Sequence, residues 1–174
     1  MISDKAVIDK SSKLEYSTEV GPFSIVGREV KIGKNVKISS HVVITGNTSI
    51  SDDCEIFSFA SIGNTPQDLK FKGEKTKLII GKKNKIREYV TINPGTEHGG
   101  GVTKIGDNCL FMISSHIAHD CKIGNNVVIA NDTHLGGHTT IEDNVVIGGV
   151  CAFNQFVRVG RNAFVAGSSV VIKD

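Results

Sequence analysis

The sequence predicts an all-β protein, a single-stranded parallel β-helix whose six-residue repeats coil into a triangular prism. Three observations predict this fold. An aliphatic side chain recurs at every sixth position over most of the chain, and a small or β-branched residue follows it four positions later. The composition, with 19 glycines and no tryptophan in 174 residues, favours many tight corners around a slim aliphatic core.

The first series of repeats runs without interruption from Ile8 to Ile62. A period of six fits neither an α-helix nor a long strand, but it fits a short strand followed by a corner. Three units of six residues complete one turn, so residues 18 apart stack on turns spaced about 4.8 Å apart. The aliphatic positions are Ile8, Leu14, Val20, Val26, Ile32, Ile38, Ile44, Ile50, Ile56 and Ile62.

The second series continues to the end of the chain, with a shift of one position after Ile92. It predicts that one domain, residues 1–174, contains the whole coil. The aliphatic or aromatic positions are Ile80, Ile86, Ile92, Ile105, Phe111, Ile117, Ile123, Ile129, Leu135, Ile141, Ile147, Phe153, Val159, Val165 and Val171.

Two segments depart from the repeat. Residues 64–79 are rich in lysine, glycine and polar side chains, and residues 97–104 contain a run of three glycines. If the first segment replaces a corner, Ile92 stacks on Ile62 and both excursions leave from one edge. Insertions on one edge of a solenoid commonly build its binding face.

Charge and hydropathy exclude several classes of function. The formal net charge is only +2, too small for the field that holds nucleic acid, so we expect no nucleic-acid partner. No apolar run approaches the roughly 18 residues of a membrane span, and the start of the chain has no apolar leader segment. We therefore expect a cytoplasmic protein.

The four cysteines indicate neither a zinc site nor disulfides. No pair of them is separated by two residues, and each occupies the same small, inward position of a repeat. Free cysteine commonly packs as a small apolar residue. The packing role is expected for Cys54, Cys109, Cys121 and Cys151.

A cluster of histidines is the strongest chemical feature. His116, His119, His134 and His138 fall within 23 residues, and Gly137 follows His119 by 18, one turn above it. A lone histidine is usually a surface residue, but a glycine above His119 leaves space beside the imidazole and a bare backbone N–H.

Those groups suit acyl transfer to a hydroxyl. The reaction needs a base that titrates near neutral pH, a group that orients the base, and a donor for the oxyanion of the tetrahedral intermediate. His119, a carboxylate and the Gly137 N–H can fill these roles. Asp120 can orient the imidazole if a corner intervenes, since adjacent residues of a strand point to opposite faces. The sequence contains no Gly-x-Ser-x-Gly elbow, which favours direct transfer over a covalent acyl-enzyme.

Six segments carry a resemblance to a known family. They are Phe59-Ala60-Ser61-Ile62-Gly63, Gln67-Asp68-Leu69-Lys70, Ile86-Arg87-Glu88, Gly99-Gly100-Gly101, His116-Ile117-Ala118-His119-Asp120-Cys121 and Leu135-Gly136-Gly137-His138. Together they resemble the UDP-N-acetylglucosamine 3-O-acyltransferases of lipid A biosynthesis, a family of hexapeptide-repeat acyltransferases. The resemblance covers the whole chain and implies a left-handed coil and a homotrimer with active sites between subunits.

The resemblance implies roles for individual residues. His119 is the expected general base for the sugar 3-hydroxyl, Asp120 supports it, and the Gly137 N–H holds the oxyanion. The expected donor is an (R)-3-hydroxyacyl chain on acyl carrier protein, the acceptor is UDP-N-acetylglucosamine, and neither a cofactor nor a metal is required. Further family positions that bind the sugar nucleotide or the acyl group are matched by Asp68, Lys70, His116, His138 and Gln155.

The acyl chain is expected to lie along the coil axis between subunits. Asn131, Gly149 and Gly167 are each 18 apart, so they stack, and the two glycines leave a strip without side chains. Gly167 also matches the family position that limits chain length. Two turns span about 10 Å, far more than an acetyl group needs, so a long 3-hydroxyacyl donor is expected.

The chain departs from the family at four places. Asn154 stands beside Gln155 where a histidine is usual, Asn93-Pro94 replaces a more polar and basic pair, and Phe71 replaces a commoner tyrosine. Family members also continue beyond the position of Asp174 into a C-terminal helical domain that contacts the nucleotide, so we expect this chain to lack that part.

Three other functions are compatible with the repeat. A sugar acetyltransferase that uses acetyl-CoA would be separated by a donor screen, although the sequence of residues 64–79 argues against it. A γ-type carbonic anhydrase would bind zinc through three histidines, but His116 and His119 lack the longer spacing of its ligands. A non-catalytic scaffold would show no transfer in an activity assay.

Overall fold

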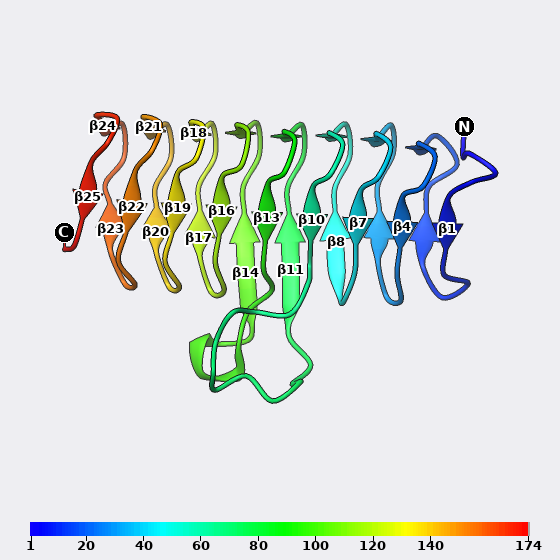
Figure 1. Cartoon of the computed structure of the whole chain (residues 1–174), viewed down its shortest axis with the longest axis horizontal. Coiled ribbons are helices and arrows are strands. Elements are labelled where there is room, and N and C mark those ends of the chain that lie inside the picture. Colours follow the sequence, from blue (N-terminus) through cyan, green and yellow to red (C-terminus); the bar gives the residue numbers. More distant parts are fainter. Residues whose placement is uncertain (174) are drawn as a thin grey trace.

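The computed structural model describes residues 1–173 as a prism with three parallel sheets, named A, B and C here (Figure 1). Each turn of the coil contributes one short strand to each sheet, in the order B, C, A. Asp174, the last residue of the predicted domain 1–174, lies outside the described residues, and the single-domain assignment stays a prediction.

The strands of each sheet pair only with strands of the turns directly above and below. Sheet B consists of β1 (Val7–Ile8), β4 (Ile25–Val26), β7 (Val43–Ile44), β10 (Ser61–Ile62), β13 (Thr91–Ile92), β16 (His116–Ile117), β19 (His134–Leu135), β22 (Ala152–Phe153) and β25 (Val170–Val171). Sheet C consists of β2 (Lys13–Leu14), β5 (Lys31–Ile32), β8 (Thr48–Ile50), β11 (Lys77–Ile80), β14 (Val102–Ile105), β17 (Lys122–Ile123), β20 (Thr140–Ile141) and β23 (Arg158–Val159). Sheet A consists of β3 (Glu19–Val20), β6 (Lys37–Ile38), β9 (Glu55–Ile56), β12 (Lys85–Ile86), β15 (Leu110–Phe111), β18 (Val128–Ile129), β21 (Val146–Ile147) and β24 (Phe164–Val165).

The pairing register confirms the predicted stacking. His116 pairs with His134, 18 residues later, and Ile62 pairs with Ile92 across the first excursion. The second residue of nearly every strand points into the prism, where the aliphatic side chains form one continuous core. The four cysteines are free and buried in this core, as predicted, and burial raises the pKa of Cys121 to about 12, which leaves it an unreactive thiol.

The prism has three edges, named by the sheets that they join. The BC edge includes residues 118–121 and 136–139, the CA edge includes residues 124–127 and 142–145, and the AB edge includes residues 148–151. Many corners contain a non-glycine residue with positive φ, such as Asp120 at 60°. Such a residue turns the chain sharply, so neighbouring side chains at a corner do not alternate between faces.

Both excursions leave from the BC edge, where Figure 1 shows them projecting from the same side of the coil. They extend from β10 to β11 and from β13 to β14, so each ends three residues earlier than predicted, at residues 76 and 101. The second contains the 3-10 helix η1 (Glu97–Gly99), which Thr96 caps at its start. Within residues 1–173, no helix is long and apolar enough to cross a membrane.

Candidate active site

A groove of about 630 Å³ runs across the outer side of sheet B at the level of the histidine cluster. It reaches from the AB edge to the BC edge, where the excursions lie. It brings together residues that are far apart in the sequence, namely Gln67, Tyr89, Thr91, Asn93, Ser114, His116, Ala118, His119, His134, Leu135, Gly136, Gly137, Ala152, Phe153 and Gln155.

His119 and Asp120 form a buried pair at the BC edge. The His119 Nδ1 atom lies 2.8 Å from Asp120 Oδ2, and the residues are only 5% and 3% exposed. The corner condition for this contact is met, because Asp120 has φ 60° and its side chain turns back beside its neighbour. A carboxylate at Nδ1 leaves the other ring nitrogen, Nε2, as the proton acceptor.

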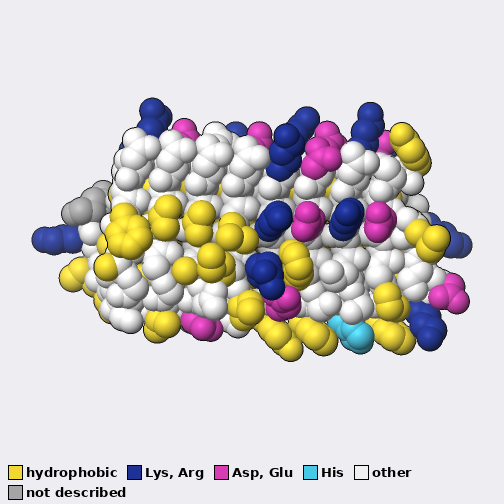
Figure 2. Space-filling model, turned by 90° about the horizontal axis from the view of Figure 1, so that it is seen from above, with side chains coloured by type: hydrophobic (Ala, Val, Ile, Leu, Met, Phe, Trp, Pro, Cys, Tyr) yellow, Lys and Arg dark blue, Asp and Glu magenta, His cyan; other side chains and the backbone are white. Residues whose placement is uncertain are grey.

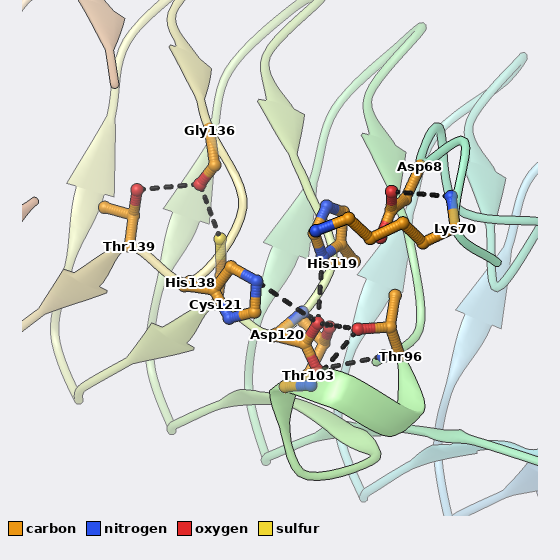
Figure 3. Close-up of polar contacts among 11 residues, drawn as sticks. Asp68, Lys70, Thr96, Thr103, His119, Asp120, Cys121, Gly136, His138 and Thr139 are labelled. Carbon is orange, nitrogen blue, oxygen red and sulfur yellow. Dashed lines mark hydrogen bonds and ion pairs between the residues drawn. The ribbon is translucent and has the colours of Figure 1, made fainter. Parts of the chain in front are cut away.

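Two threonines hold Asp120 in place (Figure 3). The Thr96 hydroxyl donates to Asp120 Oδ2 at 2.6 Å and the Thr96 backbone N–H donates to Oδ1 at 2.9 Å, while the Asp120 N–H donates to the Thr103 hydroxyl. Gly99 packs on the carboxylate so closely that a β-carbon there would lie 1.9 Å from Asp120 Cγ. The second excursion therefore covers and orients the carboxylate.

Gly137 lies directly against the His119 ring. A β-carbon on Gly137 would lie 2.6 Å from His119 Nε2, so any side chain there would displace the imidazole. Among the described residues, no hydrogen bond from the Gly137 N–H is found. The position thus combines an unpaired donor with the free Nε2 of His119, and the stacking of Gly137 on His119 is as expected from their spacing.

His138 and His116 flank the pair. His138 Nε2 lies 4.0 Å from Asp120 Oδ2, and the His138 ring stacks on Phe156 with centroids 4.3 Å apart. His116 Nδ1 lies 2.7 Å from the Thr91 hydroxyl. Burial lowers the pKa of both histidines from its usual value, which favours the neutral, hydrogen-bonding form of each ring.

The first excursion places Asp68 and Lys70 near the base, and Figure 3 shows the Lys70 side chain extending toward His119. The Lys70 backbone N–H donates to Asp68 Oδ1 at 3.0 Å and lowers the pKa of that carboxyl group. Gln155 lies in the groove, one turn above Gly137. Gly167 does not line the groove, because it lies on a later turn of the AB edge, between β24 and β25, stacked on Gly149.

Three side chains are close enough to share a metal ion. One ligand atom each from His119, Asp120 and His138 lie within 4.8 Å of one another. This set of ligands differs from the three histidines of a γ-type carbonic anhydrase. In addition, Asp120 already accepts hydrogen bonds from Thr96 and His119. The arrangement therefore suits proton transfer without a metal.

Sequence reasoning missed three residues that shape the site. Thr96 and Thr103 fix Asp120, and Asn93 was noted only as a departure from the family. Asn93 and Thr96 lie within the second excursion, and Thr103 lies in β14, the strand that follows it. A threonine that begins a short turn ahead of a glycine run is a capping signal, which could have identified Thr96.

Comparisons with known proteins point to one family. Residues 103–137 match the family model described as bacterial transferase hexapeptide (six repeats). The acyl-[acyl-carrier-protein]--UDP-N-acetylglucosamine O-acyltransferase of Aliarcobacter butzleri (strain RM4018) is 49% identical over 173 residues, which cover 99% of this chain and 66% of that protein. The protein with the same description from Paracoccus denitrificans (strain Pd 1222) is 51% identical over 119 residues, 68% of this chain and 46% of its own length.

Solved structures match over nearly the whole coil. The crystal structure of UDP-N-acetylglucosamine O-acyltransferase (LpxA) from Moraxella catarrhalis RH4 superposes with a TM-score of 0.98 at 44% identity, covering 99% of this chain and 67% of that one. This superposition confirms the predicted left-handed β-helix. The chain spans about half the length of some curated relatives and about two thirds of others. With this identity and coverage, the chain belongs to the UDP-N-acetylglucosamine O-acyltransferase family.

Proposed function

We propose that the chain transfers an (R)-3-hydroxyacyl group from acyl carrier protein to the 3-hydroxyl of UDP-N-acetylglucosamine, the first step of lipid A biosynthesis. The observation that carries the proposal is the buried His119–Asp120 pair whose free nitrogen faces Gly137. Names of the relatives supply the substrates, and the site supplies a mechanism that fits them.

In the proposed mechanism, His119 Nε2 takes the proton of the sugar 3-hydroxyl as its oxygen attacks the carbonyl carbon of the donor thioester. The carbonyl oxygen becomes an oxyanion, to which the Gly137 N–H donates a hydrogen bond. Asp120 keeps the Nδ1 proton in place and stabilises the imidazolium. The intermediate then collapses, the C–S bond breaks, and His119 returns its proton to the leaving thiolate.

Residues around this centre are proposed to bind the sugar nucleotide. Asp68 and Lys70 approach from the excursion, His116 and Gln155 line the groove, and neutral His138 adds a hydrogen-bonding ring beside Asp120. Uncharged imidazoles suit a polyhydroxyl ligand, because each ring can accept and donate a hydrogen bond.

We propose that Gly167 limits the length of the acyl chain. Ala152, which lines the groove, and Val170, one turn above it, are exposed and give this part of the outer side of sheet B an apolar character. A side chain on Gly167 would meet only Gly149 backbone atoms, at 3.2 Å and beyond. Gly167→Met should therefore keep the coil intact and shift preference to a shorter donor, read by mass spectrometry of products from competing donors. Unchanged selectivity would show that the chain takes another path.

We propose a homotrimer because the outer face of sheet A carries a row of exposed apolar side chains. The outer row of sheet A changes from alternating charges to apolar side chains halfway along, and Figure 2 shows the apolar half as a continuous row. The row runs Glu19, Lys37, Glu55, Lys85, Leu110, Val128, Val146, Phe164. Phe164 is 73% exposed, and apolar rows of this kind mark contact surfaces. Light scattering should give about three times 18.6 kDa, and a monomer would exclude a site between subunits.

A cytoplasmic location and an acidic protein donor complete the proposal. Lys82 and Lys85 pair with Asp52 and Glu55, whereas Lys70, Lys72 and Lys75 of the first excursion form no ion pair among the described residues, and we propose that these three steer an acidic carrier protein.

The decisive experiment is a donor and acceptor screen with the purified chain. Hydroxyacyl carrier protein with UDP-N-acetylglucosamine should give the 3-O-acyl product, and EDTA should not change its rate. Transfer from acetyl-CoA alone would indicate a sugar acetyltransferase, zinc-dependent CO₂ hydration a carbonic anhydrase, and no transfer a scaffold.

A further inference from the structure

Asn93 follows β13 at the root of the second excursion and reaches across to the first. Its side-chain amide nitrogen donates to the backbone carbonyl oxygens of Asn64 at 3.0 Å and Thr65 at 3.4 Å. Its own backbone N–H donates to the Ile117 carbonyl, two residues before His119. Asn93 thus joins β16, the strand that leads to His119, to the loop that contains Asp68 and Lys70.

The orientation of this amide is fixed by its partners. Two carbonyl oxygens face the nitrogen, so the reversed amide would place oxygen against oxygen. The Asn93 Oδ1 atom is consequently left buried without a hydrogen-bond partner among the described residues, although the residue is only 6% exposed. A buried, unpaired acceptor is unfavourable for folding, so stability alone gives no reason for asparagine here.

Among the described residues, the hydrogen bonds that join the first part of the loop to the coil lie at its root, at residues 63–65. The Asn64 side chain donates to the Ser61 hydroxyl at 2.7 Å and accepts from the Thr45 hydroxyl at 3.2 Å. Beyond Pro66, the hydrogen bonds of Asp68 run within the loop itself, to the backbone N–H groups of Lys70 and Phe71. The position of Asp68 relative to His119 therefore depends on how the root is held.

We infer that Asn93 is a positioning residue. It acts as a latch, a set of hydrogen bonds that holds the first excursion against β16, the strand that precedes His119, and so sets where Asp68 and Lys70 meet the sugar nucleotide. The roles of Asp68 and Lys70 in this inference rest on the proposed function. The latch itself is a statement about the loop and is testable without turnover.

The first test measures amide hydrogen exchange of Lys70 and Phe71 by millisecond labelling in Asn93→Leu and in the isosteric Asn93→Asp. Both variants should exchange faster than wild type, because leucine lacks the donors and aspartate presents oxygen to two carbonyls. The matched control is Asn84→Leu, at the CA edge, where a fully buried asparagine bonds the Gly106 carbonyl and the Cys109 N–H. Exchange rates at Lys70 and Phe71 that are equal in wild type and both Asn93 variants would overturn the latch.

The second test separates positioning from a purely structural role. Asn93→Leu should raise KM for UDP-N-acetylglucosamine about tenfold to a hundredfold with kcat little changed, and melt no lower than Asn84→Leu does. In an Asp68→Asn background the same substitution should have little further effect on KM, since both act through one contact. Additive effects, or an unchanged KM, would contradict the inference. An inactive wild type would refute the proposed function instead, and the exchange result would still decide the latch.

Discussion

The BC and CA edges of the prism share one backbone but carry different chemistry. At the CA edge the left-handed positions of successive turns are Asn126, Asn144 and Asn162, with φ between 56° and 60°. Asparagine adopts this conformation readily, and each amide bonds the next one at 3.0 Å. The equivalent BC positions hold Asp120, His138 and Phe156.

The two edges also differ at the residue before the left-handed position and in how deeply their side chains are buried. Asn125 and Asp143 at the CA edge correspond to His119 and Gly137 at the BC edge. Of the CA side chains, Asn125 is exposed and Asp143 is half-buried, whereas the second excursion covers Asp120 with Thr96 and Gly99. The repeat thus fixes the backbone, and a site arises where the residues depart from the preferred ones and an insertion excludes water, which strengthens the charge interactions.

The largest effect is expected at the base. His119→Ala should lower turnover roughly 10² to 10⁴-fold, the usual contribution of a general base. Asn125→Ala, the equivalent change at the CA edge, and His134→Ala in the groove should leave turnover near wild type. Steady-state kinetics of the three variants, with light scattering as a check on assembly, would measure this. Near-normal turnover by His119→Ala would refute the mechanism.

A smaller loss of activity is expected when a β-carbon is added at Gly137, the position that corresponds to Asp143 at the CA edge. Gly137→Ala should displace the His119 ring and lower kcat/KM about 10²-fold, as small misplacements of reacting groups do. Gly160→Ala is the matched control, since a β-carbon there meets nothing within 4 Å. Equal activity of the two variants would show that the imidazole tolerates displacement.

The hydrogen bond from the Thr96 hydroxyl to Asp120 should contribute less to turnover than His119 or Gly137 does. Thr96→Val removes the hydroxyl donor to Asp120 but keeps the backbone N–H, so we expect a loss of about tenfold in kcat, in line with one hydrogen bond to a charged group. Thr96→Ser restores the hydroxyl and should recover most of the rate. A serine variant as slow as the valine variant would assign the effect to packing.

The smallest effect is expected at the CA edge. Asn144→Ala removes two exposed amide bonds, to Asn126 and Asn162, and should lower the free energy of unfolding by about 1 kcal/mol. Turnover should not change. Thermal melting and an activity assay of the same sample test both parts, and a loss of turnover would mean that the two edges are coupled.

The sequence by itself determined the coil, because inward aliphatic residues at every sixth position leave one way to bury them. It also determined that Gly137 lies above His119, since residues 18 apart stack wherever the repeat is unbroken. The His119–Asp120 contact needed the tertiary structure, because it depends on a left-handed corner residue that periodicity does not reveal.

Contacts of the excursions were likewise decided only by the tertiary structure. Thr96 bonds Asp120 across 24 positions, and Asn93 bonds Asn64 across 29. Neither separation equals the 18 residues of one turn, so stacking arithmetic does not predict these pairs. A repeat reports which side chains point inward, whereas a loop outside it adopts the path that its long-range hydrogen bonds and packing select.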